Sequence, residues 1–146
     1  MCTQIDDKAT KVMNKNLKNT GNIAWKVVKV VENDYYAPMR EGLKYKRKKR
    51  NTEIQPVKSN AYYPKAIGAG VFHLFRSRKI GREMLKAMKE LPYYYGDKLK
   101  LIKVFYGKKD FHGIGTGTGF TYSLRIVLDR HELNTVCVKG FKFVED

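Results

Sequence analysis

The chain is 146 residues long and 42% hydrophobic, which is enough for one buried core and too little for two domains of ordinary size. Its 30 Lys and Arg against 14 Asp and Glu give a formal net charge of +16. A net charge of about 2 to 8 already keeps a small domain soluble. The excess therefore favours a phosphate-rich partner, whose counterions are released on binding. A membrane surface fits less well, because no basic helix has an opposite face rich in Trp, Phe and Leu.

Cysteine usage and the N-terminal segment indicate the compartment. Cys2 and Cys137 are too few for a disulfide framework and form no Cys-x-x-Cys or Cys/His ligand cluster, which is typical of a reducing interior. Residues 1–20 are polar, and no stretch approaches the about 18 consecutive apolar residues of a membrane span. We therefore expect a cytoplasmic protein with no membrane association, and we predict neither a metal nor a cofactor.

The first half of the chain predicts short strands around a polar start. Residues 1–22 have four-residue spacing of apolar side chains, which fits either a marginal helix or a mobile arm. Residues 23–31 are dense in β-branched residues and include the single Trp, Trp25, so they read as the first strand. A short strand at residues 43–46 then leads to the run KRKKRN, which we place at a hairpin tip.

The second half of the chain predicts one helix among further strands. Residues 70–75 alternate as a strand and lead to Ser77, a suitable N-cap. In residues 78–91 the apolar side chains fall on one helical face and the basic ones on a solvated face, and Pro92 ends the helix. Strands follow at residues 98–106, 121–128 and 135–144.

These elements predict an α+β fold with residues 23–146 as a single domain and residues 1–22 as an arm or marginal helix. A mainly antiparallel sheet would be packed by one amphipathic helix at about residues 78–91. The order IAWKVVKVV, GVFHLF, a helix capped by Ser77 and KLKLIKVFY resembles small accessory proteins of phages and other mobile elements. The resemblance covers residues 23–128 and implies a context only, that of counter-defence factors in the host-cell cytoplasm.

The basic run and the tyrosines suggest how a polyanion would be bound. Consecutive cations at residues 46–50 can contact several phosphates, without sequence specificity of their own. Tyrosines in turns, at residues 62–63 and 93–95, can stack on unpaired bases. A simply solvated run is the plain alternative. The candidate nucleic-acid or phosphate-binding residues are Arg40, Lys44, Lys46, Arg47, Lys48, Lys49, Arg50, Lys58, Tyr62, Tyr63, His73 and Arg76.

A glycine-rich segment at residues 112–119 is a second candidate. Its glycines occur at every second position, which matches neither dinucleotide nor P-loop spacing, and a strand rather than a helix follows. A flexible hairpin connection and a ligand loop remain open alternatives. The candidate ligand-loop residues are His112, Gly115, Thr116, Gly117 and Thr118.

Three functional hypotheses follow. The first is a non-enzymatic binder of RNA, DNA or a nucleoprotein complex. The second is a binder of a phosphorylated small molecule such as a cyclic nucleotide, for which we expect a homo-oligomer, because a pocket between copies encloses more ligand. The third is a nuclease or nucleotide-modifying enzyme using His73 or His112, which ranks last because no catalytic constellation is visible in the sequence.

Overall fold

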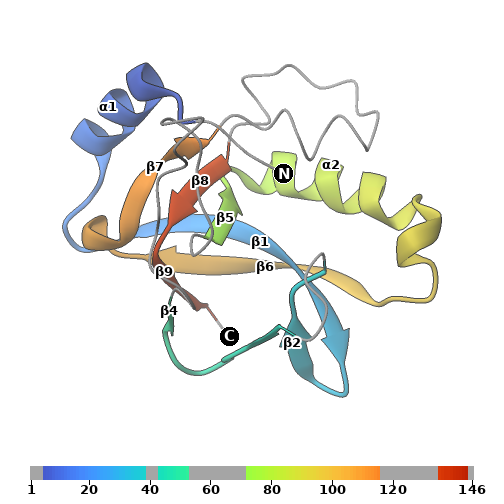
Figure 1. Ribbon diagram of the computed structural model, residues 1–146. Coiled ribbons are helices and arrows are strands. Elements are labelled where there is room, and N and C mark those ends of the chain that lie inside the picture. Colours follow the sequence, from blue (N-terminus) through green and yellow to red (C-terminus); the bar gives the residue numbers. More distant parts are fainter. Residues whose placement is uncertain (1–4, 39–42, 53–71, 116–134, 145–146) are drawn as a thin grey trace, which may run out of the picture.

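One antiparallel sheet organises the chain in the computed structural model, which describes residues 5–38, 43–52, 72–115 and 135–144 (Figure 1). The strand order is β4 (Asn51–Thr52), β9 (Gly140–Phe143), β6 (Leu99–Tyr106), β1 (Asn22–Val31), β5 (Phe72–Phe75), β8 (Thr135–Val138) and β7 (Phe111–Gly115). From β1 the sheet also continues into β2 (Asp34–Tyr36), which pairs with β3 (Lys44–Tyr45). The predicted α+β class with a mainly antiparallel sheet is confirmed.

Strong curvature of the sheet follows from its connectivity. Val138 ends β8 and Gly140 begins β9, so one residue, Lys139, joins two strands that stand four places apart in the strand order. Four steps of about 4.8 Å would separate them by about 19 Å in a flat sheet, whereas two consecutive Cα steps reach about 7.6 Å at most. The sheet must therefore curl, and it encloses the main core on its inner face.

Aromatic side chains fill much of this main core. Five rings meet edge to face, with centroids 4.9 to 6.2 Å apart. This geometry is the one that aromatic quadrupoles favour. The rings belong to Tyr35, Tyr45, Phe72, Phe141 and Phe143.

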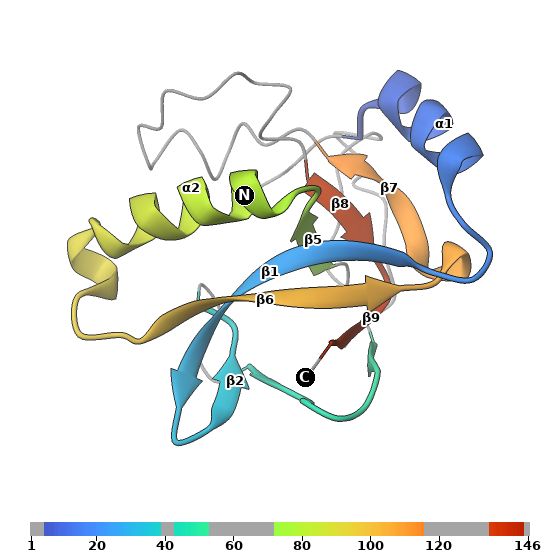
Figure 2. The same ribbon diagram turned by 180° about the vertical axis from the view of Figure 1, so that it is seen from behind.

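Helix α2 (Arg78–Lys89) covers part of the outer face of the sheet (Figure 2). Ser77 caps it as predicted, since its Oγ accepts from the Ile80 N–H at 3.2 Å. Met84 and Met88 are buried against β1, β5 and β6. The helix ends at Lys89 rather than residue 91, because the Glu90 N–H already turns back to the helix carbonyls and the 3-10 turn η1 (Pro92–Tyr94) follows.

The N-terminal segment forms helix α1 (Asp7–Asn16), the helical alternative of the prediction. Asp6 caps it by accepting from the Ala9 N–H at 3.0 Å, and Thr10 Oγ1 accepts from the Ile114 N–H at 2.9 Å. The Ile5 and Thr10 side chains pack directly over Gly113, where a Cβ would lie 3.4 Å from each of them.

Two strand predictions are wrong in detail. The strand predicted at residues 135–144 is split at Lys139, because β8 pairs with β5 and β7 whereas β9 pairs with β4 and β6. The basic run is not a hairpin tip, since β3 pairs with β2 and β4 pairs with β9. The strand predicted at residues 121–128 lies outside the described residues.

Candidate functional site

Three described cations of the basic segment, Lys44, Arg47 and Arg50, make contacts within the protein. Lys44 Nζ lies 3.2 Å from the carboxylate of Asp34. The Arg47 guanidinium lies 4.3 Å from the ring centroid of Tyr35 and also donates to the Asn33 carbonyl. These contacts tie the segment to the β1–β2 hairpin.

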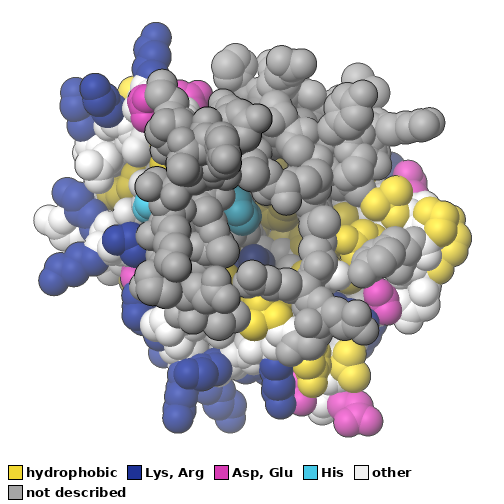
Figure 3. Space-filling view, in the orientation of Figure 1, with side chains coloured by type: hydrophobic (Ala, Val, Ile, Leu, Met, Phe, Trp, Pro, Cys, Tyr) yellow, Lys and Arg dark blue, Asp and Glu magenta, His cyan; other side chains and the backbone are white. Residues whose placement is uncertain are grey.

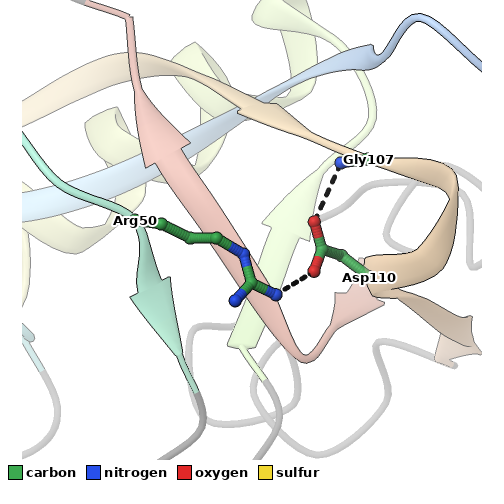
Figure 4. A network of polar contacts seen from close by, with 3 residues as sticks. All are labelled: Arg50, Gly107 and Asp110. Carbon is green, nitrogen blue, oxygen red and sulfur yellow. Dashed lines mark hydrogen bonds and ion pairs between the residues drawn. The ribbon is translucent and has the colours of Figure 1, made fainter.

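Arg50 links two parts of the chain that are distant in the sequence (Figure 4). Its guanidinium forms an ion pair with Asp110, whose other oxygen accepts from the Gly107 N–H at 2.9 Å. Asp110 ends the 3-10 turn η2 (Lys108–Asp110), and its side chain is only 13% exposed. A Cβ on Gly140 would lie 2.4 Å from the Arg50 guanidinium, so this side chain crosses β9 directly over Gly140 and a larger residue there would displace it.

The other cations of the segment face solvent. Lys46, Lys48 and Lys49 are exposed, and the loop that carries them is closed by Asn51, whose side chain accepts from the Lys46 N–H and donates to the Lys46 carbonyl. Figure 3 shows Lys and Arg side chains along the lower edge of the molecule, beneath the segment that joins β3 and β4. Only these three lysines of the run are left for an external anion.

The remaining predicted residues fall in several places. Arg76 is exposed just after β5. Gly115 lies within β7 and pairs with Thr135 of β8, and His112 lies in the same strand at the shift in register between Phe111 and Gly113, so neither lies in a connection between strands. Several predicted contacts lie outside the described residues, namely Arg40, Lys58, Tyr62, Tyr63, Thr116, Gly117 and Thr118.

His73 lies on the sheet face opposite Phe72 and Leu74, as predicted. Its Nδ1 is 3.2 Å from Thr135 Oγ1 and 3.4 Å from Cys137 Sγ. Surrounding protein atoms, and then the charge of Lys26, lower the pKa of His73 to about 4, although the side chain keeps solvent-accessible surface. The imidazole is therefore neutral at pH 7 and adds nothing to the charge of an anion site.

The neighbours of His73 do not supply a reactive group at neutral pH. Burial raises the pKa of the Cys137 thiol to about 12, so it stays protonated. Burial and then the charge of Lys139 lower the pKa of His112, and no hydrogen bond joins the two described imidazoles. Within the described residues, no three His, Cys, Asp or Glu side chains gather as metal ligands.

Helix α2 carries a row of cations that the sequence had assigned to solvent. They occur at spacings of three and four residues along about 18 Å of helix. In the described part of the chain, no ion pair joins them to an acidic residue. We call them the α2 stripe: Arg78, Lys79, Arg82, Lys86 and Lys89, all exposed.

The position of the α2 stripe is not explained by helix stability. Cations favour the last turn of a helix, where Lys86 and Lys89 lie, but they oppose the helix dipole in the first turn. Arg78 and Lys79 occupy that first turn, which has no acidic residue. An anion bound along the stripe would offset this cost.

Aromatic side chains with accessible surface lie at both ends of the α2 stripe, one half-buried and one exposed. At its start, the Arg78 guanidinium lies 5.7 Å from the ring centroid of Trp25. At its end, Lys89 lines a shallow cavity of about 420 Å³ together with Tyr95, a residue that is 66% exposed. The predicted tyrosine cluster is thus divided, because Tyr94 is buried beneath α2.

Comparison of the chain with known proteins identifies no relative. No family model, no curated protein and no solved structure matches the chain. The resemblance to accessory proteins of mobile elements stays a prediction. Among the described residues, no helix has the length and apolar character needed to cross a membrane.

Proposed function

We propose that the protein binds nucleic acid without acting on it chemically, with the α2 stripe as its main contact to phosphates. The observation that carries the proposal is a row of five exposed cations, two of them in a helix turn where they oppose the helix dipole. A polyanion laid along the helix meets these charges in sequence and releases its own counterions.

Further cations extend this surface beyond the helix. Lys98 borders the cavity at the C-terminal end of α2, and Lys103 lies 5.9 Å from the Trp25 ring near its N-terminal end. Lys46, Lys48 and Lys49 supply a second set of phosphate contacts on the β3–β4 segment. Contacts to phosphates do not distinguish one base sequence from another. The proposed partner is therefore a host or phage nucleic acid, or a nucleoprotein, that is recognised through its accessible phosphate backbone.

A salt titration tests the proposal. Single-stranded and duplex oligonucleotides carrying a fluorescent label are titrated with the protein at about 50 to about 200 mM salt, and log K is plotted against log salt. Five phosphate contacts along the α2 stripe predict a slope of about −3.5 on a single strand and about −4.5 on a duplex, and each further contact from the β3–β4 segment steepens it by about 0.7 or about 0.9. A flat plot would refute binding through phosphate contacts. Retention of one small phosphorylated compound in fixed ratio through purification, with no oligonucleotide binding, would overturn the proposal in favour of a nucleotide-binding protein.

A further inference from the structure

The outer face of the sheet is open beyond the start of α2. Figure 2 shows the N-terminal half of β1 and the C-terminal half of β6 continuing past the first turn of the helix. On this open part Ile23 is 46% exposed and Phe105 is 39% exposed, and Trp25 is half-buried. We call these three residues the platform.

Cations flank the platform in register. Phe105 pairs with Ile23 on one side and with Lys142 on the other, so the three side chains form one cross-strand row. In the next row on the same face, Trp25 pairs with Lys103. Lys103 and Lys142 are exposed, and neither row contains an acidic residue.

Two cations approach the Trp25 ring itself. The Arg78 guanidinium and Lys103 Nζ lie 5.7 and 5.9 Å from its centroid, within reach of a cation–π contact. Each of these cations is also exposed, so it can contact a phosphate without leaving the ring. The platform thus places apolar π surface and phosphate partners side by side.

The Phe105 ring packs closely over the backbone at Gly21. A Cβ on Gly21 would lie 1.8 Å from this ring, so the ring rests where only a glycine leaves room. Gly21 also has a φ of +126°, a conformation that other residues rarely adopt. One side of the ring is therefore supported, while the rest remains open to solvent.

We propose that the platform stacks unpaired bases, so that the nucleic acid bound along the α2 stripe is single-stranded. This inference rests on the proposed function. Bases in single strands expose the ring faces that aromatic side chains stack on, while neighbouring Lys and Arg follow the backbone. In a duplex those faces are already stacked on one another. A second copy of the chain is a poor occupant, because it would bring a like charge of +16 against these cations.

The fluorescence of Trp25 tests the inference, since it is the only Trp in the chain. A single-stranded dT oligonucleotide is expected to quench it on binding, whereas inorganic polyphosphate, which has no bases, is expected to bind with little quenching. Phe105→Ala is expected to weaken single-strand binding about 5-fold or more, as for the loss of one stacked base. Phe105→Tyr should retain it, and Val12→Ala, which removes an exposed apolar side chain from α1, serves as the control.

Several results would overturn the inference. If Phe105→Ala and Phe105→Leu bind the single strand as tightly as the wild type, the phosphate contacts alone carry binding and the proposed function stands without the platform. Equal quenching of Trp25 by dT and by polyphosphate, or tighter binding of a duplex than of a single strand, would likewise show that the platform does not stack bases. A dimer that Phe105→Ala converts to a monomer would assign the platform to a second copy. The absence of binding to any oligonucleotide would instead refute the proposed function itself.

Discussion

Lys26 is a buried cation in the main core, and its removal should stabilise the protein at neutral pH. Its side chain is 9% exposed, Nζ donates to the His73 carbonyl at 3.2 Å, and the ring centroids of Tyr45 and Phe141 lie 5.4 and 5.7 Å away. No carboxylate pairs with it among the described residues. Burial lowers its pKa from 10.5 to about 8.

The sign and size of the effect follow from this pKa. Below pH 8 both the folded and the unfolded chain hold the proton, and the folded state bears a penalty of about 3 kcal/mol. Between pH 8 and 10.5 only the unfolded chain holds it, so the free energy of unfolding rises with pH. Lys26→Met removes the penalty and loses a hydrogen bond of about 1 kcal/mol, which leaves a gain of about 2 kcal/mol at pH 7.

Urea unfolding followed by circular dichroism at pH 7, 9 and 10.5 measures this difference. The gain from Lys26→Met should shrink as the pH rises and become a loss of about 1 kcal/mol at the top of the range. Lys100→Met removes an exposed lysine from the same sheet and controls for the loss of one charge. A stability difference that does not change with pH, or a loss at pH 7, would refute this account of the buried ammonium.

Two further predictions concern polar groups in the fold. Tyr106→Phe should raise the free energy of unfolding by about 1 kcal/mol, because the buried Tyr106 hydroxyl has no hydrogen-bond partner in the described structure; a loss in thermal unfolding would show that the hydroxyl is bonded. Asp110→Asn should cost about 1 to 2 kcal/mol, since it breaks the ion pair with Arg50. As a comparison, Asp34→Asn breaks a more exposed ion pair with Lys44 and should cost under about 1 kcal/mol. If urea unfolding gives the same loss of stability for both variants, the Arg50–Asp110 ion pair contributes no more than a surface pair.

Local patterns were enough to predict the main elements. The apolar spacing in residues 78–91 and the capping Ser77 located α2, and the alternation in residues 23–31 and 98–106 located β1 and β6. The break at Lys139 could not be predicted, because residues 135–144 alternate as a continuous strand and only the curl of the sheet sends its two halves to different partners.

The candidate site depended on tertiary placement. The basic run was visible in the sequence. The sequence did not show that Arg47 and Arg50 contact residues far away in the chain. The stripe on α2 was visible as a solvated face, and Phe105 as a strand residue. What the sequence could not give is where α2 lies on the sheet, which decides that the Phe105 end of β6 stays open. The two-residue spacing of Lys103 and Phe105, which places both on one face of β6, was a local signal of the platform.

The most direct test of the nucleic-acid interface compares two triple variants that lose the same charge from different helices. The first neutralises the α2 stripe with Lys79→Gln, Arg82→Gln and Lys86→Gln. The second removes three exposed lysines of α1 with Lys8→Gln, Lys11→Gln and Lys15→Gln.

Binding of a single-stranded oligonucleotide to both variants is measured across a salt series. The account predicts that the α2 variant loses affinity and that its slope of log K against log salt becomes shallower by about 2, three phosphate contacts at about 0.7 each, while the α1 variant keeps a slope close to that of the wild type. Equal slopes for the two variants would mean that binding follows net charge alone, and would contradict an interface on α2.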